Sequence, residues 1–240
     1  MKMKTRFIAL SLAVMTLCAN VSVFAESKVY NDVDEKSPYY DAVAYMNEIG
    51  VFTGVSDTEF APDTNLTRGM FVTLLGRVYE NLNGSEGAPV KTATETKFKD
   101  VAVGDYYCAS VNWAQENGIV AGYSDEIFAP NDILTKQQAV TILHRFSKYA
   151  KDEFSSGENT NILSYEDFNS ISQYAIPSIQ WGLENGIITD DGKYINADKN
   201  VTRAQAAQYL YNYTEKWFNS RGDAEVTDTD TADTEVSAEK

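Results

Sequence analysis

The amino-acid sequence predicts a mainly α-helical protein made of three tandem helix-loop-helix units. Glycines recur every 68 residues, at Gly50, Gly118 and Gly186. Aromatic residues and threonines recur at 67 or 68 residues, at Tyr45, Trp113 and Trp181 and at Thr67, Thr135 and Thr202. Self-similarity at a fixed period is the sequence signature of a repeat protein. Because a unit of about 55 residues buries little core by itself, we expect the three units to share one helical core.

Each unit should contain a first helix, a loop and a second helix. The recurring glycines stand where the first helix ends, because glycine adopts the left-handed conformation that closes a helix. The recurring threonines precede the second helices, where a hydroxyl can cap a free backbone N–H group. Gln138 and Gln205 lie three residues further on and predict capping boxes, whereas Met70 in the first copy cannot form one. Apolar residues then follow at helical spacing.

Residues 1–25 have the features of a secretory signal. Three basic residues precede an apolar stretch from Phe7 to Cys18, and small residues suitable for cleavage end at Ala25. A membrane anchor is the alternative, but a spanning helix needs roughly 20 apolar residues and this stretch is shorter. We therefore expect export, cleavage after residue 25 and no membrane contact afterwards.

The remaining chain divides into three units, two linkers and a tail. The linkers are rich in Gly, Ser, Thr and charged residues. The tail is acidic and almost free of apolar residues, so we expect it to be disordered. The expected boundaries are 26–82 for the first unit, 83–96 for the first linker, 97–150 for the second unit, 151–161 for the second linker, 162–220 for the third unit and 221–240 for the tail.

Charge and cysteine content exclude several classes of protein. Removal of the signal leaves 17 basic against 35 acidic residues, a net charge of −18. Such a chain does not suit nucleic acid or anionic lipid, which bind basic surfaces. Cys108 is the only cysteine outside the signal, so no disulfide framework is possible and a buried packing role is expected.

The sequence offers no recognisable catalytic or metal-binding constellation. His144 is the only histidine, which leaves no zinc-histidine cluster and no ordinary Ser-His-Asp triad. Paired carboxylates arise by chance in so acidic a chain and do not indicate a glycosidase. We therefore expect a protein that is not an enzyme, with no catalytic residues, no metal and no cofactor.

The motifs of the three units resemble those of S-layer homology domains. The first copy carries YNDV, VFTG, FAPD and LTRGM; the second carries FKDV, GIVAGY, FAPN and LTKQQ; the third carries YEDF, GIIT and VTRAQ. The resemblance covers about residues 29–220. It implies a pseudo-threefold prism around a shared helical core. It also implies non-covalent binding to a secondary cell-wall polysaccharide, often with pyruvylated sugars, in grooves between neighbouring units at the cell surface.

The resemblance also implies which residues line the grooves. They are an early aspartate, an aromatic at the start of the first helix, the glycine of the Gly-Ile-Ile-x-Gly step and the cation of the Thr-Arg cap motif. In this sequence these are Asp32, Asp100 and Asp167; Tyr40, Tyr106 and Tyr174; Gly54 and Gly122; and Arg68, Lys136 and Arg203. A guanidinium at a helix N-terminus suits a sugar carboxylate, and aromatic rings suit sugar faces.

Departures from the family motifs predict three unequal grooves. Tyrosines replace the tryptophan of the motif, and Pro38 stands at that position in the first copy. Lys136 cannot offer the bidentate fork of an arginine, and Asp190 replaces the third step glycine. The grooves that use Arg68 and Arg203 are therefore the better candidates.

Several alternatives remain open at this stage. The early aspartates could cap turns, and the cap arginines could be surface residues of a first helical turn. The aromatic residues at 45, 113 and 181 are expected to pack between units rather than to contact sugar. The chain could also be a self-associating S-layer subunit or envelope tether, or it could act through an unidentified surface-protein partner.

Overall fold

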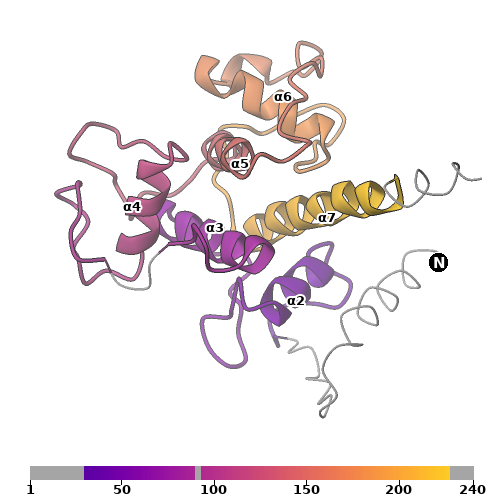
Figure 1. Cartoon of the computed structure of the whole chain (residues 1–240). Helices are drawn as coiled ribbons and strands as arrows, with labels where there is room; N and C mark the ends of the chain where they lie inside the picture. Colours follow the sequence, from indigo (N-terminus) through magenta and orange to yellow (C-terminus); the bar gives the residue numbers. More distant parts are fainter. Residues whose placement is uncertain (1–29, 90–92, 228–240) are drawn as a thin grey trace, which may run out of the picture.

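The computed structural model describes residues 30–89 and 93–227, with side chains described as far as Arg221. These residues form six α-helices and two short 3₁₀ turns, and only isolated β-bridges instead of strands, which confirms the mainly α prediction (Figure 1). The helices are α2 (Tyr40–Glu48), α3 (Arg68–Asn83), α4 (Cys108–Glu116), α5 (Lys136–Ala150), α6 (Ile176–Glu184) and α7 (Arg203–Thr227), and the turns η2 (Phe168–Ser170) and η3 (Gln173–Ala175) precede α6.

The predicted helix boundaries follow from local chemistry. Gly50, Gly118 and Gly186 have φ angles of 70°, 69° and 67°, as expected for residues that end a helix in the left-handed region. Gln205 forms the predicted capping box, because its side chain accepts from Thr202 N at 3.0 Å while its own backbone N–H donates to the threonine hydroxyl at 3.3 Å.

The expected secretory signal lies outside the described residues. No helix within them is long and apolar enough to cross a membrane.

A ring of backbone hydrogen bonds joins the segments just before the second helices. Leu66 N donates to Val201 O at 2.8 Å, Val201 N donates to Leu134 O at 2.8 Å, and Leu134 N donates to Leu66 O at 3.0 Å. β-Bridges between Asn65 and Thr202, Thr67 and Ile133, and Thr135 and Asn200 repeat this cyclic order. The ring brings the starts of α3, α5 and α7 together; the full prism shape stays a prediction.

Each short helix packs on the long helix of the preceding unit in the ring. α4 lies on α3, α6 lies on α5, and α2 lies on α7 at the other end of the chain (Figure 1). The recurring aromatic residues make these contacts. Their ring centroids lie 5.6 Å apart for Trp113 and Tyr79, 4.7 Å for Trp181 and His144, and 5.4 Å for Tyr45 and Tyr211. The predicted packing role of these aromatic residues is therefore confirmed.

The predicted tail begins later than the sequence suggested. α7 continues to Thr227, so residues 221–227 are helical rather than part of a disordered tail, and residues 228–240 lie outside the described part. Composition favoured disorder here because the segment is polar. A helix that is already nucleated and packed extends at low cost through residues such as Ala224 and Glu225, even with a glycine at 222.

His144 predicts a pH dependence of stability. The imidazole is buried, its Nε2 donates to Ser155 O at 3.1 Å, and its Nδ1 accepts from the Ser178 hydroxyl at 3.1 Å. Burial lowers the pKa of His144 below its ordinary 6.5, although the Ser155 carbonyl and the Glu158 carboxylate oppose this and Lys148 and Arg145 reinforce it. The stabilisation is therefore complete above pH 6.5 and is lost as the pH falls below that value.

We expect the unfolding free energy, measured by urea titration, to fall more between about pH 7.5 and about pH 5.5 for the natural chain than for His144→Gln. Glutamine keeps a donor for Ser155 O and does not titrate. The chain's many carboxylates contribute equally to both proteins, so only the difference between them reports on the histidine. An identical pH dependence of the two proteins would contradict the assignment.

Candidate functional site

The cation of each cap motif reaches out of its own unit into the next one. Arg68 donates from Nε to Phe128 O and from Nη2 to Ala121 O, both at 3.1 Å. Arg203 donates from Nε to Phe60 O at 2.7 Å and from Nη2 to Thr53 O at 3.0 Å. The third unit thus grips the first one in the way that the first unit grips the second.

Lys136 makes the corresponding contact from the second unit to the third. Its Nζ donates to Ile195 O at 2.6 Å and, more weakly, to Thr189 O at 3.5 Å. These are the counterparts of the carbonyls that the arginines bind. A lysine therefore fills the structural place of the arginine with one nitrogen atom instead of three, and it has less left to offer a ligand.

The two cap arginines are buried between aromatic rings. Arg68 is 5% exposed, and its guanidinium carbon lies 4.8 Å from the ring centroid of Tyr123 and 4.6 Å from that of Phe128. Arg203 is 6% exposed and lies over Phe52 at 4.4 Å and over Phe60 at 4.7 Å. Burial lowers the pKa of both side chains, which stay charged because a guanidinium does not lose its proton in proteins. The alternative of surface arginines is wrong.

The early aspartates hold the turn that precedes each cap motif. Both carboxylate oxygens of Asp32 accept backbone N–H groups, from Phe60 at 2.8 Å and from Ala61 at 2.7 Å. Asp100 and Asp167 make the same pair of bonds in their own units. The second residue of each pair has a positive φ (Ala61 59°, Ala129 58°, Asn196 59°), which is costly for a residue with a side chain. The expected alternative of turn-capping aspartates is observed, and their contact with sugar stays a prediction.

The step glycines sit where no side chain fits. A Cβ atom on Gly122 would lie 2.5 Å from Ile127 O and 2.6 Å from a ring carbon of Phe98. Gly54 is equally crowded by Tyr30, whose hydroxyl accepts from Gly54 N at 2.6 Å and donates to Asn47 Oδ1 at 2.6 Å. Both glycines therefore let the aromatic that begins the unit close over the step.

The predicted helix-start aromatics divide into two kinds. Tyr106 is 63% exposed and Tyr174 is 54% exposed, although burial still raises the pKa of each phenol. The positive charge of Arg203 opposes this rise at Tyr106, and that of Arg68 opposes it at Tyr174, so each ring lies near the cap arginine of a different unit. Tyr40 instead packs partly buried against the core.

All three units therefore meet at the two cap arginines. One unit supplies the cation, the next supplies the carbonyls and rings around it, and the remaining unit supplies the residue at the outer rim. The sets are Arg68 with Tyr123 and Tyr174; Arg203 with Tyr106 and, by register, Val55; and Lys136 with Asp191 and, by register, Pro38.

Tyr123 is a site residue that sequence reasoning missed. It is 56% exposed and lies directly over the Arg68 guanidinium. The sequence feature that could have revealed it is an aromatic residue immediately after the step glycine. This feature occurs only in the second copy, because Val55 stands there in the first copy and Asp191 in the third. Of the three predicted grooves, the one at Arg68 is the only one with two exposed tyrosines among the described residues.

The Lys136 groove differs in charge. Burial lowers the pKa of Lys136, and the carboxylates of Asp167, Asp190 and Asp191 oppose that shift. Asp190 also accepts a hydrogen bond from the Tyr165 hydroxyl at 2.9 Å, so it occupies the space of the missing glycine. Three nearby carboxylates make this groove unfavourable for an anionic ligand.

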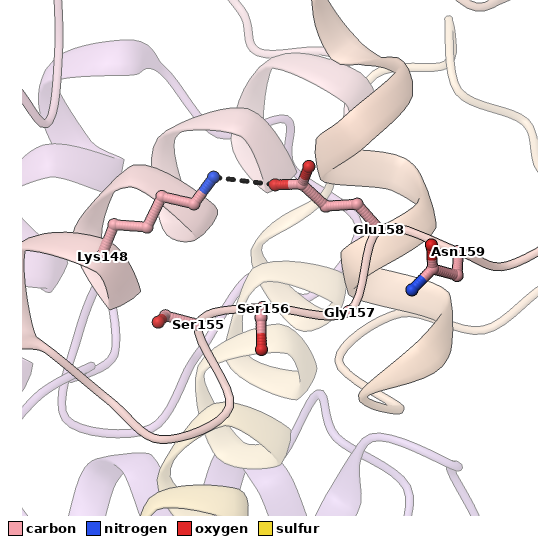
Figure 2. Close-up of a pocket in the computed structure, with 6 residues that line it drawn as sticks. All are labelled: Lys148, Ser155, Ser156, Gly157, Glu158 and Asn159. Carbon is pink, nitrogen blue, oxygen red and sulfur yellow. Dashed lines mark hydrogen bonds and ion pairs between the residues drawn. The ribbon is translucent and has the colours of Figure 1, made fainter.

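A separate pocket of about 430 Å³ lies beside the second linker and contains none of the predicted site residues. It is lined by Lys148, Ser155, Ser156, Gly157, Glu158 and Asn159 (Figure 2). Its cation is already paired, because Lys148 Nζ lies 2.8 Å from Glu158 Oε1. The pocket therefore has no free positive charge for an acidic sugar.

Comparison with known proteins identifies the class. The sequence matches the S-layer homology domain family over residues 29–69, 97–140 and 164–207, which together make more than half of the chain. The chain belongs to the S-layer homology domain family. The three matches correspond to the three predicted units. Membership of this family, together with similarity to proteins named for surface layers and cell walls, makes this a cell-surface protein.

Curated relatives share this region with much longer proteins. The chain is 30% identical over 183 residues to an endoglucanase of Bacillus sp. (strain KSM-635), which covers 75% of this chain and 18% of that protein. It is 25% identical over 207 residues to the surface-layer 125 kDa protein of Lysinibacillus sphaericus, covering 84% and 16%. A cellulosome-anchoring protein of Acetivibrio thermocellus is 29% identical over 111 residues, covering 43% and 22%. The chain therefore spans less than a quarter of these relatives.

A substitution at the step glycine tests whether this residue is required for packing of the fold. We expect Gly122→Ala to lower the unfolding free energy by about 1–3 kcal/mol, because the added Cβ overlaps backbone and ring atoms that cannot move independently. Gly104→Ala is the matched control, since no atom lies within 4 Å of its Cβ position. Thermal unfolding measures both. Equal stability of the two variants would show that the glycine is not required for packing.

Proposed function

We propose that the chain binds a secondary cell-wall polysaccharide non-covalently at the junctions between its units and so anchors itself to the cell wall. The observation that carries this proposal is the meeting of three units at the two cap arginines, each with an exposed tyrosine nearby, Tyr174 at Arg68 and Tyr106 at Arg203. Membership of the family supports it. So does similarity to proteins named for surface layers, cell walls and anchoring.

The chemistry of the two arginine grooves fits a sugar that carries a carboxylate, as a pyruvylated sugar does. Within the described part of the chain, the hydrogen bonds of each arginine use Nε and Nη2, and its Nη1 can donate to a ligand. The guanidinium is held in place by carbonyls and rings, so little side-chain entropy is lost on binding. The exposed faces of Tyr106, Tyr174 and Tyr123 can pack against sugar rings.

We further propose that the grooves differ in affinity. The Arg68 groove has a guanidinium and two exposed tyrosines, and the Arg203 groove has a guanidinium and one. The Lys136 groove has a single ammonium surrounded by carboxylates. The order of affinity is therefore Arg68, Arg203 and then Lys136.

We also propose that the chain has no catalytic activity of its own. The relatives named as glucanases and as an amylopullulanase share only 10–18% of their length with it, and a surface-layer protein shares a similar 16% of its length. The alternative of a self-associating surface-layer subunit is favoured by the names of some relatives. Assembly of the purified protein without wall material would distinguish it.

The anchoring proposal is tested by sedimentation with purified cell walls. We expect the chain from Glu26 onward to sediment with intact walls and not with walls from which the secondary polymer has been removed. Salt at about 0.5 M should weaken binding little, because protein and polymer are both anionic and long-range attraction does not drive association. Equal sedimentation with stripped walls, or assembly into sheets without walls, contradicts the proposal.

The ranking of the grooves is tested with exposed tyrosines, since replacing a buried arginine would also destabilise the fold. We expect Tyr174→Ala to weaken binding to purified wall polymer by about tenfold, as loss of one stacked aromatic does. Tyr106→Ala should weaken it less, and Pro38→Ala in the lysine groove should leave it unchanged. Binding isotherms and melting temperatures are measured together. A loss for Pro38→Ala as large as that for Tyr174→Ala would overturn the ranking.

A further inference from the structure

Two of the three short helices are covered by a linker in the same way. Trp113 of α4 donates from its indole nitrogen to Gly87 O at 2.7 Å, and Trp181 of α6 donates to Phe154 O at 2.8 Å. Gly87 and Phe154 each lie 11 residues before the aromatic that begins their unit's aspartate motif. The two linkers thus cross their tryptophans at the same register.

One further hydrogen bond holds each linker at a later position in its sequence. Asn112 donates to Glu95 O at 2.6 Å, and Gln180 donates to Thr160 O at 2.8 Å. Each of these amides directly precedes its tryptophan in the sequence. The outer face of a short helix in this fold is therefore a surface that binds an extended segment through its backbone carbonyls.

The face of α2 has neither the indole N–H nor the side-chain amide that hold the linkers on α4 and α6. Tyr45 replaces the tryptophan and Ala44 replaces the amide. Tyr45 is only partly buried, whereas Trp113 and Trp181 are buried. By register, residue 19 is the counterpart of Gly87 and Phe154, and it falls in the expected signal, outside the described residues. The segment that precedes α2 in the sequence is therefore not among the described residues.

The chemistry of this face is acidic and aromatic, with two exposed carboxylates, one half-buried carboxylate and two half-buried tyrosines. Tyr45 meets Tyr211 of α7 edge-on, and we call these two residues with the nearby Asp41, Glu48 and Glu215 the α2–α7 face. Burial and the charges of Glu215 and Glu48 raise the pKa of Tyr45. Among the described residues, none of the three carboxylates has a cationic nitrogen within 4 Å.

We propose that the α2–α7 face binds an extended basic segment of a partner protein, which lies along α2 as the linkers lie along α4 and α6. Lysine or arginine side chains would pair with the three carboxylates and stack on the two tyrosine rings. The chain's own C-terminal residues 228–240 do not fit, because they carry five acidic residues and one lysine. The site is distinct from the three grooves of the proposed polysaccharide contact.

The test uses a labelled 14-residue peptide with the sequence of residues 84–97 in which Glu86 and Glu95 are replaced by lysine. Fluorescence anisotropy measures its binding to the chain from Glu26 onward. We expect binding that weakens as salt is added, and about tenfold weaker binding to the triple variant Asp41→Asn, Glu48→Gln and Glu215→Gln. A peptide in which Lys91 and Lys97 are replaced by glutamate should not bind.

A second triple variant controls for net charge. Glu86→Gln, Glu116→Gln and Glu153→Gln remove the same number of charges at exposed positions of the second unit and the two linkers, and this variant should bind the basic peptide as the natural chain does. Both triples should sediment with cell walls normally, which separates this inference from the anchoring proposal. The inference is overturned if the basic peptide fails to bind, if both triples weaken binding equally, or if the acidic peptide binds as well.

Discussion

The ring of three backbone hydrogen bonds among Leu66, Val201 and Leu134 is the constraint on which the rest of the structure depends. It fixes the starts of the three long helices next to one another. The cap cation that follows each ring residue can then reach the neighbouring unit. Because every unit completes its cation shell and its short-helix packing with parts of the others, no unit forms its full set of contacts alone. Cooperative folding of the three units is the physical consequence.

The polar residues at the junctions make most of their contacts within the protein, which stabilises the fold. A buried guanidinium is costly unless it is fully paired, and Arg68 meets that cost with two carbonyls and two aromatic rings. Both carboxylate oxygens of Asp32 likewise accept hydrogen bonds from the backbone of a strained turn. What remains for a ligand is the outer edge of the arginine and the tyrosines around it. Residues that define the family motif thus mostly hold the fold together, and under the proposed function the exposed residues beside them would set the differences in specificity.

The sequence predicted local features well and the contacts between units poorly. Period and capping chemistry located the helices, because Thr202 and Gln205 act within one turn of chain. Period alone could not show that α2 packs on α7, since identical repeats can close in more than one order. It could not assign Asp100 to a turn, because a carboxylate suits a sugar hydroxyl and a backbone N–H equally well. Tyr123 was missed because its position is aromatic in one copy only.

Departures from the repeat are where the three units acquire different properties. A cyclic fold of identical units would have three equal grooves and three covered short helices. Here Lys136 and Asp190 change the electrostatics of one groove, and Tyr45 and Ala44 remove the donors that hold a linker on α2. These substitutions leave the hydrogen-bonded ring intact, because Lys136 still reaches the carbonyls that an arginine would bind. The ring therefore tolerates divergence at its periphery, which allows one architecture to place different side chains at its three junctions and on its three short helices.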